Sequence, residues 1–97
     1  MVKIDFTGRF NSMYSAVLEK KPELKEEVFK RVNWFVRRPD DERLDNHALR
    51  KRMNGKWAFS ITNDIRIVYE WKTKNVARFL AIGGHGKVYG RETKHKG

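Results

Sequence analysis

The spacing of hydrophobic residues changes several times along the chain, and each change marks an expected element. Residues 2–6 alternate between apolar and polar, which predicts a short strand with Val2, Ile4 and Phe6 turned inward. Thr7 is suited to cap a helix, because its hydroxyl accepts a hydrogen bond from a free backbone N–H of the first turn. The apolar residues that follow recur at helical spacing and are Phe10, Met13, Tyr14, Val17 and Leu18.

A second helix is expected from residue 22 to residue 37. Pro22 suits its first turn, where a missing backbone N–H costs nothing, and Pro39 follows its end. Glu side chains near its start and Lys and Arg side chains toward its end complement the helix dipole, so these charges indicate a structural role. Its apolar face consists of Leu24, Val28, Val32 and Phe35. A polar loop is predicted to continue to about residue 56.

Apolar and polar residues alternate again in the second half of the chain. The pattern predicts strands over residues 57–62, 65–72 and 76–82, and Gly83 and Gly84 are expected to end the last one. The order β-α-α-β-β-β indicates an α+β fold. We expect a single domain over residues 1–97, in which two N-terminal helices cover one face of a mainly antiparallel twisted sheet.

The alternation also divides the sheet into two faces. The residues expected to face the helices are Trp57, Phe59, Ile61, Ile65, Ile67, Tyr69 and Trp71. The residues expected on the opposite, open face are Ser60, Thr62, Arg66 and Val68. On the last strand, either Phe79 or the set Arg78, Leu80 and Ile82 faces the helices. Because Arg78 is charged, we favour Phe79, which places Arg78 near Arg66 on the open face.

Composition narrows the class of protein. Hydrophobic residues make up 39% of the 97, so a packed core is expected rather than intrinsic disorder. The absence of cysteine excludes disulfides and thiolate metal sites. No apolar run approaches the ~20 residues of a membrane span, and the N-terminus lacks the long apolar core of a signal peptide. We therefore expect a small soluble domain in the cytoplasm.

The formal net charge of +10 is concentrated in the second half of the chain. Residues 1–46 carry 10 Lys and Arg against 9 Asp and Glu, whereas residues 47–97 carry 12 against 3. This segregation favours a nucleic-acid partner over a generically basic surface. Arg66 is the most informative cation, because a mid-strand guanidinium on a rigid face is suited to bind phosphate. The alternative is an exposed arginine paired with Glu70.

A glycine-rich segment near the C-terminus offers further chemistry. Residues 83–89 read Gly-Gly-His-Gly-Lys-Val-Tyr, and the glycines let a ligand approach the backbone beside His85. Histidine transfers protons near neutral pH, and Tyr89 offers an aromatic face for a nucleobase. The residues alone fit equally well a surface turn with an incidental histidine and a buried tyrosine. His47 precedes a basic run, and two histidines without cysteine do not indicate a metal site.

Four short motifs occur in order along the chain. They are H-x-L at 47–49, G-x-W-x-x-x-I at 55–61, D-x-R-x-x-Y at 64–69 and I-G-x-H-x-x-x-Y at 82–89. The ordered set resembles the RelE/ParE toxin superfamily, and within it the YafQ-like ribonucleases. Together with the helical hairpin, the resemblance covers residues 2–89. It implies the toxin of a type II toxin–antitoxin pair, which binds a small antitoxin and cleaves mRNA, typically in the ribosomal decoding site.

The resemblance also implies roles for individual residues. Arg66 would contact the scissile phosphate, His85 would be the catalytic acid, and Tyr89 would stack on a base. His47 and Asp64 also belong to the active site of the YafQ-like branch. That branch has a further histidine where this chain has Ser60, so the base role is open between His47 and Asp64.

The reaction expected from these residues is attack of the ribose 2′-OH on the adjacent phosphorus, without metal or cofactor. The cations expected to hold the RNA backbone are Lys51, Arg52, Lys56, Arg78, Lys87 and Arg91. Two other functions are compatible with the fold: a ParE-like gyrase inhibitor without chemistry, and a passive RNA-binding module. The pair His85 and Tyr89 favours the nuclease, because ParE-like chains generally lack it.

Overall fold

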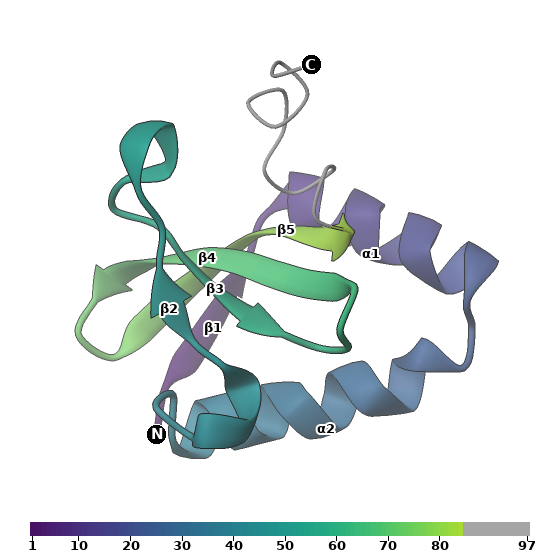
Figure 1. The fold of residues 1–97 in the computed structure, drawn as a ribbon, viewed down its shortest axis with the longest axis horizontal. Coiled ribbons are helices and arrows are strands. Elements are labelled where there is room, and N and C mark those ends of the chain that lie inside the picture. The colour runs from purple at the N-terminus through teal and green to yellow at the C-terminus, as the bar shows by residue number, and fades with distance from the viewer. Residues whose placement is uncertain (85–97) are drawn as a thin grey trace.

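A five-stranded mixed sheet with two helices packed on it forms the architecture (Figure 1). The computed structural model describes residues 1–84. The elements are β1 (Lys3–Phe6), α1 (Gly8–Lys20), α2 (Leu24–Arg37), β2 (His47–Ala48), β3 (Trp57–Ser60), β4 (Ile65–Thr73) and β5 (Val76–Gly84), with single 3₁₀ turns η1 (Glu42–Leu44) and η2 (Lys51–Met53). The spatial order is β1-β5-β4-β3-β2, with β1 parallel to β5 and the other pairs antiparallel. The expected α+β fold is confirmed.

Both helices begin close to where the sequence places them. The Phe10 backbone N–H donates to Thr7 Oγ1 over 3.0 Å, which confirms the predicted cap of α1. The Thr7 hydroxyl also donates to the Phe79 carbonyl over 2.9 Å, so the same residue ties the start of α1 to β5. The second helix starts at Leu24, two residues later than predicted, and Pro22 lies in the turn before it. No helix within residues 1–84 is long and apolar enough to cross a membrane.

The core lies between the helices and one face of the sheet. Phe35 of α2 is fully buried, and its ring contacts those of Phe59, Tyr69 and Phe79 at centroid distances of 4.8, 4.9 and 5.8 Å. The predicted helix-facing residues of β3 and β4 all join this core, with Trp57 and Trp71 partly buried at its margin. Phe6, expected to point inward, packs its ring 5.7 Å from those of Phe10 and Phe79 but remains 52% exposed at the end of β1.

An irregularity in β5 changes which side chains face the helices. The register pairs Tyr69 with Phe79 but Val68 with Ala81, so Leu80 is an extra residue on β5. Because of this bulge, Phe79 and Ile82 both join the core under the helices. The choice of Phe79 is confirmed, and the expectation that Ile82 takes the opposite side is wrong. A strict alternation of apolar and polar residues does not predict a bulge.

Two further expectations about the strands need correction. The polar loop predicted up to residue 56 contains the two-residue strand β2, in which His47 pairs with Ala58 of β3. Two residues are too few to show an alternating pattern. The last strand does not stop before Gly83, because β5 includes Gly83 and Gly84 and pairs both with β4.

Candidate functional site

Arg66 lies near the start of β4, between Ser60 of β3 and Gly83 of β5. Its Nη1 donates a hydrogen bond to Ser60 Oγ over 3.0 Å, and its side chain is half-buried. Residues paired across antiparallel strands share a face, so Ser60 and Arg66 both lie on the face opposite the helices. On the β5 side, Gly83 brings no side chain next to Arg66. Within residues 1–84, the guanidinium is therefore held by a side chain on its β3 side and by none on its β5 side.

A second buried cluster lies next to this arginine along β4. It consists of Ala58, Val68 and Ala81 on the same face, and Leu49 and Met53 of the β2–β3 connection cover it in part. Because the three side chains are at most 2% exposed, this part of the face is closed to a ligand, and Arg66 lies at its margin.

His47 shares the face with Arg66. It pairs with Ala58, whose side chain belongs to this second cluster, and the ring is exposed. Two strand spacings and two residues separate His47 from Arg66, so their Cα atoms are about 12 Å apart. Nδ1 of His47 lies 2.9 Å from the Asp45 carbonyl oxygen, which can only accept a hydrogen bond. In the neutral ring Nδ1 then carries the proton, and Nε2 keeps a lone pair for accepting one.

The residue before His47 is fixed from the other side of the sheet. Asn46 Nδ2 donates to the Pro39 carbonyl over 2.9 Å, and Asn46 Oδ1 accepts from the Tyr69 hydroxyl over 2.9 Å. Burial raises the pKa of Tyr69 to about 12, partly offset by its hydrogen bond to Asn46. These two bonds hold β2 at the edge of the sheet and thereby position His47.

Asp64 lies at the opposite end of the site from β2. It is exposed in the turn between β3 and β4, and its backbone N–H donates to Thr62 Oγ1 over 3.1 Å. Together with Gly83, Gly84 and the Lys20–Lys21 end of α1, it lines a groove of about 340 Å³ on the α1 side of the sheet. Asp64 therefore lies beside the point where β5 reaches Gly84.

Arg78 is not near Arg66, and that prediction is wrong. The register places Arg78 opposite Glu70, four residues and about 13 Å along β4 from Arg66. Arg78 Nη1 lies 3.2 Å from Glu70 Oε2, and its Nε lies 3.4 Å from Asp5 Oδ2. The alternative for Arg66, an ion pair with Glu70, is also wrong, because Glu70 pairs with Arg78 instead.

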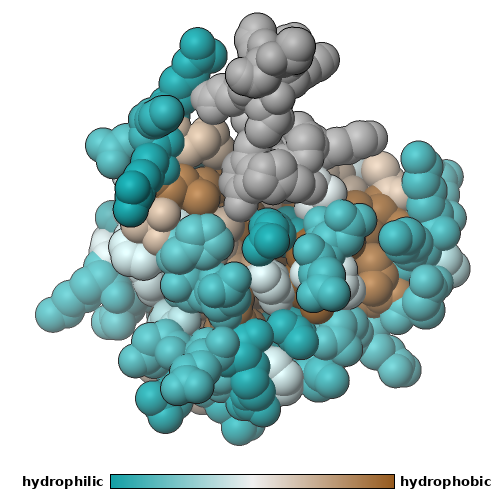
Figure 2. All heavy atoms as spheres, in the orientation of Figure 1, coloured by the Kyte–Doolittle hydropathy of each residue, from teal (hydrophilic) through white to brown (hydrophobic). Residues whose placement is uncertain are grey.

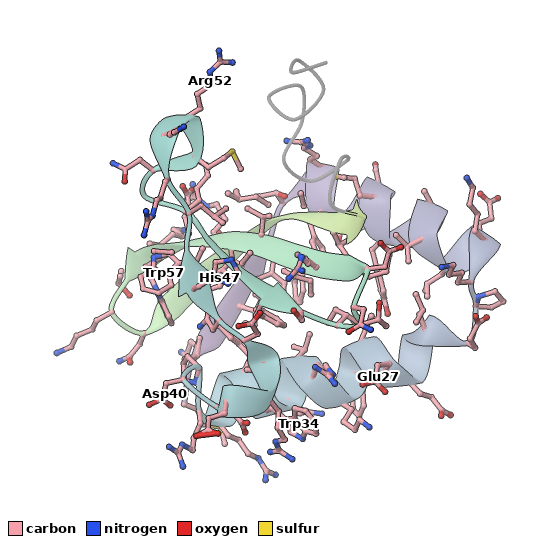
Figure 3. The ribbon with its side chains drawn as sticks, viewed as in Figure 1. Glu27, Trp34, Asp40, His47, Arg52 and Trp57 are labelled. Carbon is pink, nitrogen blue, oxygen red and sulfur yellow. The ribbon has the colours of Figure 1, made fainter. Side chains whose placement is uncertain are left out.

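The connection between β2 and β3 carries a group of cations that projects from the sheet. Lys51 and Arg52 are exposed on η2, and Lys56 is half-buried just before β3. Figure 3 shows Arg52 at the tip of this loop, directed away from the sheet, and Figure 2 shows a column of hydrophilic side chains at the same place. Lys51 has a φ of 57°, a left-handed conformation that tightens the turn.

Four predicted site residues, His85, Lys87, Tyr89 and Arg91, lie outside the described residues. Within residues 1–84, no group of three His, Cys, Asp or Glu side chains is arranged to hold a metal ion. Sequence reasoning missed Ser60 as the partner of Arg66 and treated Gly83 only as a strand end. The pairing of β3, β4 and β5 would have identified both residues, because it places Ser60 and Gly83 on either side of Arg66.

No protein-family model matches the chain, and no curated protein matches it. Solved structures do match. YafQ from Escherichia coli BL21(DE3) has a TM-score of 0.77 and 16% identity, with 93% of this chain and all of YafQ covered. A metal-bound toxin from Helicobacter pylori has a TM-score of 0.75 and 18% identity, covering 91% and 99% of the two chains. The YoeB/ParE toxin from Agrobacterium tumefaciens has a TM-score of 0.72 and 18% identity, covering 87% and 99%.

Similar structures also include complexes, DinJ–YafQ from Escherichia coli and YoeB–YefM from Staphylococcus aureus. The chain thus has the fold of the YafQ and YoeB/ParE toxins over nearly its whole length, as the resemblance in sequence implied. At these identities, the likeness establishes the fold, and the function has to be argued from the site.

Proposed function

We propose that this protein is the toxin of a type II toxin–antitoxin pair and that it is an endoribonuclease. The observation that carries the proposal is Arg66, a half-buried guanidinium that is bound to a neutral hydroxyl and lies opposite Gly83 of β5. Within residues 1–84 it has no carboxylate partner, and such an arginine keeps its full charge available for an anion such as a phosphodiester. The shared fold with YafQ and YoeB/ParE toxins supports the same function.

The chemistry needs a base for the ribose 2′-OH, an acid for the departing 5′-oxygen and a cation for the charge on the phosphorane. Arg66 supplies the cation. His47 has a lone pair on Nε2 and is one candidate for the base, and Asp64 is the other. The resemblance to the YafQ-like ribonucleases implies that His85 is the acid and that Tyr89 stacks on a base. Protein side chains can thus perform every step, and no resident metal or cofactor is required.

Cations around the site are expected to bind the RNA backbone. The β2–β3 connection contributes Lys51, Arg52 and Lys56, and the C-terminal residues contribute Lys87 and Arg91. Arg78 shares the face but has two carboxylate neighbours, so we expect the smallest contribution from it. We propose mRNA as the substrate, bound in association with the ribosome, and a cytoplasmic location.

A cognate antitoxin is the expected protein partner. The DinJ–YafQ and YoeB–YefM complexes show that toxins of this fold form such pairs. The net charge of +10 favours a partner with acidic residues against the basic half of the chain, because burying like charges without counter-charges is costly.

The test compares Arg66→Ala with Arg37→Ala, an exposed arginine at the end of α2 on the helix side. Both purified proteins are incubated with mRNA and translating ribosomes. In a separate arm they are incubated with free RNA, with and without EDTA, because EDTA would also remove the Mg²⁺ that ribosomes need. We expect Arg66→Ala to lose at least about 100-fold in cleavage rate, since removing one stabilising donor costs 10²–10³. Arg37→Ala should cleave like wild type, and EDTA should have no effect.

Three outcomes would contradict parts of the proposal. Full activity of Arg66→Ala would remove Arg66 from the chemistry, and loss of activity in EDTA would require a metal. Salt-sensitive RNA binding that leaves the RNA intact would support the passive binding module instead. DNA damage in expressing cells, with translation continuing, would support the gyrase inhibitor.

A further inference from the structure

Ser60 is bound by an arginine on each face of the sheet. On the open face, its Oγ accepts from Arg66 Nη1 over 3.0 Å. On the helix side, its carbonyl oxygen accepts from Arg31 Nη1 of α2 over 3.2 Å. A single residue at the end of β3 therefore connects the helix layer to the candidate phosphate site.

Arg31 is itself held firmly in place. Its Nε donates to Glu27 Oε2 over 2.7 Å, and its Nη1 also donates to the Arg43 carbonyl over 3.0 Å. Its guanidinium lies 5.2 Å from the centre of the Trp34 ring, and its side chain is only 21% exposed. With a carboxylate, two carbonyls and a ring around it, Arg31 defines where Ser60 lies relative to α2.

Arg66, in contrast, has few contacts within residues 1–84 that fix its direction. A long arginine side chain has many rotamers, and an oriented guanidinium requires a partner that selects one of them. The hydrogen bond to Ser60 is that partner on the β3 side, whereas Gly83 on the β5 side has no side chain to offer. The bond uses one of the five N–H groups of the guanidinium and leaves the others for phosphate oxygens.

We propose that Ser60 is a positioning residue, which holds Arg66 in the orientation that meets the scissile phosphate, and that Arg31 fixes Ser60 from the helix side. This inference rests on the proposed function, because the reaction is the one that Arg66 serves. The hydroxyl of Ser60 takes no part in proton transfer. It acts through Arg66 alone.

The main experiment compares Ser60→Ala with Ser60→Thr, which keeps a hydroxyl on the same carbon. Ser12→Ala, at an exposed serine of α1, is the matched control. We expect Ser60→Ala to lower kcat about tenfold with an unchanged melting temperature, since a small misplacement of a catalytic group costs up to about 10²-fold. Ser60→Thr and Ser12→Ala should remain within about twofold of wild type. The double variant Ser60→Ala with Arg66→Ala should cleave no more slowly than Arg66→Ala alone.

A second measurement does not depend on activity. In ¹⁵N NMR spectra, a guanidinium fixed by a hydrogen bond rotates slowly and gives sharper Nη signals than a free one. We expect the Arg66 signals to broaden in Ser60→Ala and in Arg31→Lys, and to stay sharp in Ser12→Ala.

The outcomes separate the two claims. A wild-type rate in Ser60→Ala, or equal losses in Ser60→Ala and Ser60→Thr, would overturn the positioning role. So would a double variant slower than Arg66→Ala, because Ser60 would then act independently of Arg66. If wild type does not cleave RNA, the proposed function fails, and unchanged Arg66 signals in Ser60→Ala would overturn the positioning role separately.

Discussion

Arg66 and Arg78 lie on the same face of the same pair of strands, yet their surroundings differ sharply. Arg78 has Glu70 and Asp5 within 3.4 Å, whereas Arg66 has a serine hydroxyl at 3.0 Å. The hydrogen bond from Lys72 and the proximity of Arg78 hold the pKa of Asp5 below its usual value, so this carboxylate stays charged at neutral pH. Residue type alone does not distinguish a structural arginine from one that binds a ligand. In this protein the neighbouring side chains distinguish Arg78 from Arg66.

Tyr69 provides a test of how His47 is held. Its hydroxyl donates to Asn46, the residue before His47, so Tyr69→Phe leaves the Asn46 carbonyl oxygen without this donor. We expect Tyr69→Phe to lower the free energy of unfolding at pH 7 by about 1–2 kcal/mol. Tyr14→Phe is the control, because the Tyr14 hydroxyl makes no hydrogen bond within residues 1–84, and it should change little. Urea denaturation measures both.

The raised pKa of Tyr69 also predicts how the free energy of unfolding depends on pH. The pKa of Tyr69 is about 12 in the folded protein against 10 as its ordinary value, so the unfolded chain loses this proton first. The stabilisation is therefore complete below pH 10 and is lost as the pH rises toward 12. We expect wild type to lose more stability than Tyr69→Phe between pH 9 and 11. Equal losses in the two proteins would contradict the assignment.

At the scale of elements, the start of α1 and the middle of β5 depend on one side chain. The Thr7 hydroxyl oxygen caps α1, and the hydroxyl donates to the Phe79 carbonyl. Thr7→Ala removes both bonds, and we expect the free energy of unfolding to fall by about 1–2 kcal/mol. Thr7→Ser keeps both bonds and should stay within about 0.5 kcal/mol of wild type. If Thr7→Ala had the same free energy of unfolding as wild type, neither bond would contribute to stability.

The elements also show where sequence reasoning succeeds and where it stops. Alternation over β3 and β4 assigned the helix-facing side chains correctly, because one buried face imposes a period of two. It failed at Ile82, because the extra residue at Leu80 reverses the alternation within β5. It also missed β2, whose pairing depends on a backbone contact with Ala58 and leaves no pattern in the sequence.

At the scale of the whole molecule, long-range contacts turn a generally basic chain into a defined site. The sequence placed +9 of the net charge of +10 after residue 46 and singled out Arg66. It did not predict that Arg78 pairs with Asp5, 73 residues away, or that Arg31 reaches Ser60 from α2. Such contacts depend on the register and the layering of the fold. The structure gives Arg66 a neutral partner, Ser60, and an adjacent glycine, Gly83.

The central claim is that this face cleaves RNA through the ribose 2′-OH. The most direct measurement uses ribosome-bound mRNA with a single 2′-deoxy nucleotide immediately 5′ to the mapped cleavage position, and the matched all-ribose mRNA as control. Since the 2′-OH is the attacking group, we predict that the all-ribose mRNA is cut to a 5′-hydroxyl end and a 2′,3′-cyclic or 3′-phosphate end, and that the deoxy mRNA stays intact at that position. Cleavage of both substrates at equal rates, or products with a 5′-phosphate, would contradict the account.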